Sequence, residues 1–203
     1  MPSRGANRAK PAPRAWQRML SGRRLDLLDP SPIDIEIEDI AHGLARVARW
    51  NGQTAGPRAF SVAQHSVLVE EFCRVLRPDW RPAYQMAALL HDAPEFVIGD
   101  MISPFKSAIG DNYKSIENRL QKAIHIRFGV PAELPSTIEK VIKRADRASA
   151  FFEATQFAGF TDAEARSLFG SPRGIAPMMI EVETTNVAQT RFLARFNDIL
   201  AAT

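Results

Sequence analysis

The chain has 203 residues, of which 45% are hydrophobic and 24% charged, so it is long enough for one globular domain with a sizeable core. Its single cysteine, Cys73, excludes an internal disulfide framework, and no apolar run approaches the roughly eighteen residues of a membrane span. We therefore expect a single-domain protein of the cytoplasm.

The formal net charge of +3 is unevenly distributed along the chain. Seven basic residues precede the first acid, Asp26, which leaves 19 basic residues against 23 acidic ones in the remainder. Residues 1–24 are predicted to form a basic, disordered arm, and residues 25–203 a mildly acidic domain. Such an arm could be a transit peptide or a contact for nucleic acid. A solvated tail is favoured, because Trp16 is its only aromatic residue.

The first predicted elements come directly after this arm. Isoleucines alternate with acids over residues 33–37, which predicts a short strand or an extended lead-in, and the spacing becomes helical from about residue 38. Glycine and proline mark a loop at residues 51–57. Ser61 and Gln64 then have the spacing of a capping box, which predicts the start of a second helix.

A third helix is predicted to start near Pro82 and to run to the pair His91-Asp92. Pro94 interrupts the hydrogen-bond ladder there and favours the start of a new short helix, which Gly99 ends. The segment 100–106 is expected to be a loop.

The rest of the chain has a helical period. A long amphipathic helix is predicted from Ile109 to about Ile124, followed by a helix whose capping box is Ser136 and Glu139. Thr161 and Glu164 repeat the capping signal, and a last helix carries Val182, Phe192, Phe196 and Leu200. The predicted fold class is all-α.

Four ionisable residues lie on otherwise apolar stretches of these helices. His65 follows Val62 by three residues and precedes Val69 by four, so it points towards the core. His91 and Asp92 end an apolar run. Asp146 lies on an apolar-striped helix, where an unpaired carboxylate would cost several kcal/mol.

A single divalent metal accounts for all four residues. Independent buried ion pairs would need a cation beside each acid, but Arg144 and Arg147 lie on other faces of the helix than Asp146. Two imidazoles and two carboxylates suit Mn, Co, Fe, Ni, Zn or Mg, so the identity of the metal stays open.

Short motifs surround these residues. They are the run Ser61–Ser66, the run His91–Glu95, Gly99-Asp100 followed by Pro104 and Lys106, and Ala145-Asp146. In order and spacing they resemble the HD-domain metal-dependent phosphohydrolases. The resemblance is to bacterial 5′-deoxynucleotidases and to phage-type deoxynucleoside triphosphate hydrolases, and it covers residues 36–156.

The resemblance implies a role for each matching residue. His65, His91, Asp92 and Asp146 would bind one divalent metal. Glu95 would assist proton transfer, and Asp100 would contact the sugar or help to activate water. Lys106 and Arg49 would bind phosphate, and Trp50 would lie against the sugar and disfavour a 2′-hydroxyl. Glu153 lies seven residues after Asp146 on the same helix face and could line the pocket, but a surface position is the default expectation for it, and His125 is expected to be a surface residue.

The fold implied is a helical bundle with the metal site at its centre. The reaction implied is hydrolysis of a nucleotide phosphate ester, above all of a deoxynucleotide. A monophosphate would give nucleoside and phosphate, and a triphosphate would give nucleoside and triphosphate. Two alternatives stay open at this point: an alarmone (guanosine tetraphosphate) hydrolase, and a nonenzymatic nucleotide sensor or nucleic-acid-associated protein. A homo-oligomer without membrane contact is expected.

Overall fold

The computed structural model describes residues 14–102, 105–106 and 111–203. The helices there are η1 (Pro32–Asp34), α1 (Ile37–Leu44), η2 (Arg49–Gly52), α2 (Val62–Leu76), α3 (Pro82–Leu89), α4 (Glu95–Ile98), α6 (Asp111–Arg127), α7 (Ser136–Gln156), α8 (Asp162–Phe169) and α9 (Thr185–Ala201). The two strands, β1 (Trp16–Arg18) and β2 (Arg24–Asp26), form one small antiparallel hairpin. The predicted all-α class is confirmed.

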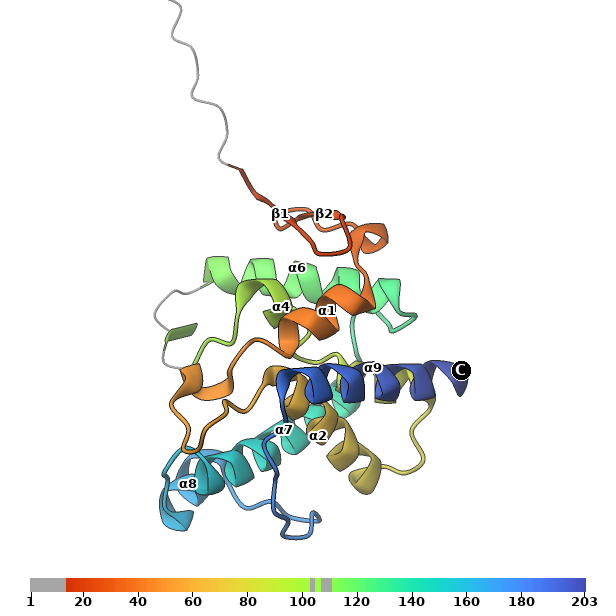
Figure 1. Ribbon diagram of the computed structural model, residues 1–203. Coiled ribbons are helices and arrows are strands. Elements are labelled where there is room, and N and C mark those ends of the chain that lie inside the picture. Colours follow the sequence, from red (N-terminus) through yellow and green to blue (C-terminus); the bar gives the residue numbers. More distant parts are fainter. Residues whose placement is uncertain (1–13, 103–104, 107–110) are drawn as a thin grey trace, which may run out of the picture.

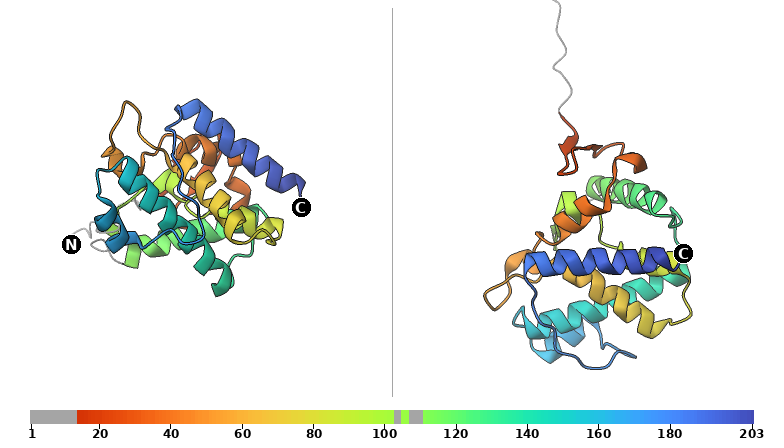
Figure 2. Two further views of the ribbon diagram at one scale, coloured as in Figure 1. Left: turned by 90° about the horizontal axis from the view of Figure 1, so that it is seen from below. Right: turned by 45° about the vertical axis from the view of Figure 1, so that its right-hand side comes forward.

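Helix α2 is the centre of the bundle and packs against α3, α7 and α9 (Figures 1 and 2). Its first three turns are almost entirely buried, so it presents core side chains on all sides rather than one stripe. Ser61 caps its N-terminus by accepting a hydrogen bond from the Gln64 amide. The Gln64 side chain instead bonds the backbone of Glu181 and Glu183, so only half of the predicted capping box forms.

Helix α1 joins the two sides of the bundle, because it packs against both α4 and α9 (Figure 1). Its contact with α4 depends on Gly43. A Cβ atom at this position would lie 2.8 Å from both the Cβ and the carbonyl oxygen of Phe96. The missing side chain therefore lets the backbone of α4, which carries Glu95, lie directly against α1.

The hairpin corrects the predicted extent of the disordered arm, because residues 14–24 are ordered. The Trp16 ring lies between the guanidinium groups of Arg14 and Arg24, 4.3 and 4.2 Å from its centroid. The backbone amide and the hydroxyl group of Ser21 donate hydrogen bonds of 2.9 and 2.5 Å to the Asp39 carboxylate. These bonds connect the hairpin to α1. These cation–π and hydrogen-bond contacts offset the ordering entropy of the segment. Residues 1–13 lie outside the described residues.

The remaining element predictions have mixed outcomes. Residues 32–34 form a 3-10 turn, because Pro32 at its start fixes a helical φ. Ile35 and Glu36 are extended and lead into α1, which agrees with the predicted extended lead-in rather than with a strand. Pro94 and Gly99 bound α4 as predicted. Thr161 and Glu164 form a complete capping box, whereas α7 is preceded by Pro135 without a side-chain cap. The predicted start at Ile109 and part of the 100–106 loop lie outside the described residues. In the portion described, no helix is both long and apolar enough to cross a membrane.

Candidate metal centre and active site

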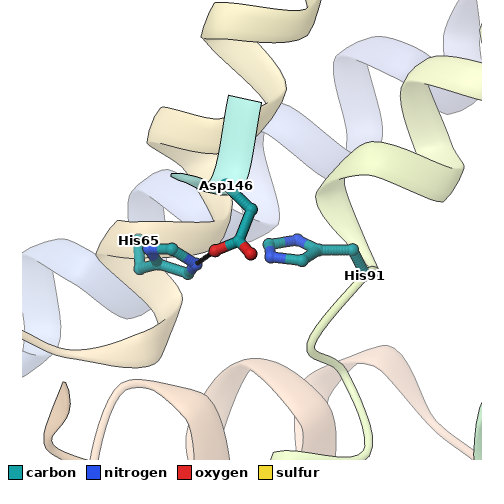
Figure 3. A group of neighbouring side chains, drawn as sticks. All are labelled: His65, His91 and Asp146. Atoms are coloured by element: carbon teal, nitrogen blue, oxygen red, sulfur yellow. Dashed lines mark ion pairs between the residues drawn. The ribbon is translucent and has the colours of Figure 1, made fainter. Parts of the chain in front are cut away.

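Three segments bring His65, His91 and Asp146 together. His65 lies in the first turn of α2, His91 follows the end of α3, and Asp146 lies in the middle of α7. One ligand atom from each residue lies within 4.8 Å of the other two. The Asp146 carboxylate extends between the two imidazole rings (Figure 3).

The histidines are oriented as metal ligands require. The Nδ1 of His65 is 2.6 Å from Glu153, and the Nδ1 of His91 is 2.9 Å from the Ala88 carbonyl oxygen. Both Nδ1 atoms are thereby protonated, which leaves both Nε2 atoms as ligand atoms. Both Nε2 atoms are buried and have no hydrogen-bond partner among the described residues, a costly state for a polar atom unless it has a ligand. The residues present therefore fit a divalent metal.

Asp92 reaches the same point from the residue after His91. Its Oδ2 lies 3.4 Å from the Nε2 of His65 and 3.3 Å from the Nε2 of His91. Burial acts to raise the pKa of Asp92, but the two neighbouring imidazoles hold it well below its ordinary value. Asp92 thus lies beside both histidines, while the group of ligand atoms within 4.8 Å of one another comes from His65, His91 and Asp146. The individual roles of the four residues stay predictions.

Glu153 lies at the site, on the helix face of Asp146, and not at the surface as the default expectation had it. It is fully buried, and its carboxylate accepts hydrogen bonds from Ser149 at 2.7 Å and from Trp50 Nε1 at 2.8 Å. Burial acts to raise the pKa of Glu153, but the charges of His65 and Arg49 and its hydrogen bonds keep it below its ordinary value. Ser149 lies on α7 itself, but Arg49, Trp50 and His65 come from elements 88–104 residues away, so α7 alone could not indicate them.

Arg49 and Trp50 are placed by an unusual backbone. Trp50 and Asn51 both have left-handed conformations, with φ of 59° and 50°, which non-glycine residues rarely adopt. The turn directs Arg49 inward, where its Nη1 lies 3.3 Å from Asp100 and 3.8 Å from Asp92. Burial acts to lower the pKa of Arg49, but the carboxylates of Glu153, Asp100 and Asp92 raise it, so the guanidinium stays charged.

Glu95 and Lys106 form a second ionisable pair near Asp92 and Asp100. Burial first, then the charges of Asp92 and Asp100, raise the pKa of Glu95 to about 9, while Arg49 and Lys106 act to lower it. The Lys106 Nζ is 3.4 Å from the Oε1 of Glu95, whereas Oε2 is buried and has no partner in the part of the chain that the structure describes. In this arrangement Glu95 carries a proton at neutral pH.

A cleft of about 680 Å³ between α6 and α7 opens onto His91 and Asp146. The Asp146 side chain is 37% exposed there. His125 lines this cleft and is buried, which corrects its prediction as a surface residue. Its Nδ1 lies 3.0 Å from the Pro131 carbonyl oxygen, because the chain folds back beyond Gly129 and covers the end of α6.

The geometry agrees with what comparison with known proteins finds. The sequence profile of the YfbR-like 5′-deoxynucleotidases matches residues 40–164, more than half of the chain. The chain belongs to the YfbR-like 5′-deoxynucleotidase family. Every predicted site residue, and Glu153, falls inside the matched segment. The predicted family resemblance is therefore confirmed, and membership implies an HD-domain phosphohydrolase.

Two curated proteins are similar to this YfbR-like chain. An uncharacterized protein of Rhodobacter capsulatus is 56% identical over 192 residues, which cover 92% of this chain and 96% of the relative. The uncharacterized protein YfdR of Escherichia coli K12 is 33% identical over 106 residues, which cover 52% of this chain and 54% of YfdR. The first likeness extends well beyond the residues that the family profile matches.

Proposed function

We propose that this protein is a metal-dependent 5′-nucleotidase that releases phosphate from deoxynucleoside monophosphates. The observation that carries the proposal is the pair of buried, unpartnered Nε2 atoms of His65 and His91 beside Asp146, within one family-matched segment. The family description supports a monophosphate rather than a triphosphate as the substrate.

His65, His91, Asp92 and Asp146 would hold the divalent ion. Such an ion lowers the pKa of bound water and withdraws charge from a phosphoryl oxygen. Glu95 supplies the proton that the departing 5′-oxygen of the nucleoside needs, because its raised pKa keeps it protonated at neutral pH. After transfer, the Glu95 carboxylate is stabilised by Lys106 at 3.4 Å.

The remaining residues bind and orient the nucleotide. Arg49 and Lys106 neutralise charge on the phosphoryl oxygens, the former as a planar fork and the latter as a point charge. Asp100 accepts from a sugar hydroxyl, and Trp50 packs against the sugar face where a 2′-hydroxyl would project. The α6–α7 cleft supplies access, since its volume of about 680 Å³ is within the range of small-molecule sites.

The proposal is tested by a substrate screen of the purified protein with added Mn²⁺, Co²⁺ or Mg²⁺. The panel contains mono-, di- and triphosphates of ribo- and deoxynucleosides together with guanosine tetraphosphate, and phosphate, pyrophosphate and triphosphate are quantified separately. We expect phosphate release from deoxynucleoside monophosphates above all. The Asp146→Ala variant serves as the inactive control.

The alternatives give different products in the same screen. Triphosphate release would identify a triphosphate hydrolase, and pyrophosphate release from guanosine tetraphosphate an alarmone hydrolase. Nucleotide binding without turnover under any metal would identify a sensor. Each of these three outcomes, in place of phosphate release from monophosphates, would refute the nucleotidase proposal. The homo-oligomeric state and the cytoplasmic location stay predictions.

A further inference from the structure

We propose that Glu153 is a positioning residue whose two carboxylate oxygens serve different halves of the site. Its Oε1 fixes the metal ligand His65, and its Oε2 fixes Arg49 and Trp50. The nucleotide half of this inference rests on the proposed function, whereas the metal half does not.

The two oxygens have separate sets of partners. Oε1 lies 2.6 Å from the Nδ1 of His65 and accepts a hydrogen bond from Ser149 at 2.7 Å. Oε2 accepts from Trp50 Nε1 at 2.8 Å and from Arg49 Nε at 3.4 Å. Both sets of contacts meet at Glu153, so this carboxylate connects the metal ligand to the predicted phosphate and sugar contacts.

Only an ionised carboxylate satisfies this geometry. All four neighbouring groups are donors, and an ionised carboxylate is an acceptor on both oxygens. Glu153 is fully buried, where an unpaired carboxylate would be costly, so the four donors together stabilise it. In return, the carboxylate keeps the His65 proton on Nδ1 and leaves Nε2 for the metal.

An amide in place of the carboxylate can serve one half of the site at a time. In the Glu153→Gln variant, an amide oxygen facing His65 leaves the amide NH₂ group against the donors of Arg49 and Trp50. In the opposite orientation, the NH₂ group faces Nδ1 and favours the tautomer with its proton on Nε2. The first orientation weakens nucleotide binding, and the second weakens metal binding.

The experiment measures the two halves separately. Cobalt affinity is measured by titration calorimetry and by the visible absorption of bound Co²⁺, without nucleotide, and KM and kcat are measured with a deoxynucleoside monophosphate. For Glu153→Gln we expect at least a tenfold loss in cobalt affinity or a tenfold rise in KM. Cobalt affinity and KM both within threefold of the wild type would overturn the proposal.

A matched control separates positioning from stability. Glu70 is also fully buried, and its carboxylate accepts two hydrogen bonds of 2.7 Å from Arg195, away from the metal ligands. Glu70→Gln should lower the melting temperature while cobalt affinity and KM stay within twofold of the wild type. Equal losses of cobalt affinity in the Glu70 and Glu153 variants would assign the effect to general destabilisation and overturn the proposal.

Two further variants keep the proposal testable if Glu153→Gln does not fold. Ser149→Ala removes a donor to Oε1 and should lower cobalt affinity a few-fold with KM unchanged. Trp50→Phe removes the indole N–H that donates to Oε2 but keeps an aromatic side chain. It should raise KM with cobalt affinity unchanged. If neither variant shows its expected change, the division between the two oxygens is wrong. The cobalt measurements stand even if the wild type hydrolyses no nucleotide, so failure of the proposed function is recognised separately.

Discussion

Replacing Gly43 by alanine tests whether close packing of α1 on α4 holds Glu95 in place. The added Cβ would lie 2.8 Å from the Cβ and the carbonyl oxygen of Phe96. Carbon atoms in contact prefer about 3.5–4.0 Å, so α4 would have to move by roughly 0.7–1.2 Å. The obstructing atoms belong to the Phe96 backbone and its first side-chain carbon, so a change of rotamer cannot relieve the contact.

The sign of the stability change distinguishes this packing from ordinary helix propensity. Alanine in place of glycine inside a helix is stabilising by up to about 1 kcal/mol. Overpacking costs about 1–3 kcal/mol, so we expect a net destabilisation of about 1–2 kcal/mol. In a chain of this size that lowers the melting temperature by about 2–8 °C. Thermal unfolding by calorimetry measures this change directly.

In the Gly43→Ala variant kcat should fall strongly even though the loss of stability is modest, because Glu95 is the first residue of the displaced helix α4. A displacement of about 1 Å at a catalytic group can lower kcat on the order of 100-fold. Cobalt affinity should change less than kcat, because His65 and Asp146 lie on helices other than α4. A higher melting temperature with unchanged kcat would refute the reasoning, because it would leave helix propensity as the only effect.

Three other changes address individual groups. Asp146→Ala should abolish cobalt binding and turnover together, measured by calorimetry and phosphate release; full turnover would remove Asp146 from the metal site. Glu95→Gln should retain cobalt and lower kcat about 10²–10⁴-fold, because the amide cannot donate the proton. Since Glu95 must be protonated to act, wild-type kcat should be maintained below its pKa of about 9 and lost as pH rises through it. A bound divalent ion lowers the pH at which this loss of kcat begins. The loss should be missing from the pH dependence of kcat in the Glu95→Gln variant. Trp50→Ala should raise the ribo- to deoxynucleotide ratio of kcat/KM about tenfold or more, because it opens space for a 2′-hydroxyl; an unchanged ratio would exclude Trp50 from sugar selection.

The clustering of His65, His91 and Asp146 could be predicted from the sequence because each of these residues interrupts an apolar pattern of its own segment. His65 lies on a buried helix, and Asp146 on the apolar stripe of α7. An ionisable group in such a place needs a partner, and the same requirement at three places indicates a shared one. An ionisable residue within an apolar pattern is visible in the local sequence, so it can be recognised without knowledge of how the helices pack.

Glu153 could not be predicted in the same way, because its partners depend on tertiary packing. Its helical position is compatible with solvent or with the core, and only the approach of η2 and α2 to α7 decides between them. The hairpin around Trp16 was missed for a related reason. Its strands are three residues each, and the contacts that order it include Asp39, outside the basic segment.

The conformation of the η2 turn also depends on contacts with a distant helix. Left-handed backbone at Trp50 and Asn51 costs about 1–3 kcal/mol for each residue. The hydrogen bonds of Arg49 and Trp50 to the buried Glu153 carboxylate supply a compensation from α7. Because the same carboxylate lies 2.6 Å from His65, the strained turn and the metal ligand are stabilised by one group. In the proposed function, the conformation that presents Arg49 and Trp50 to a nucleotide is thereby coupled to the residue that orients His65.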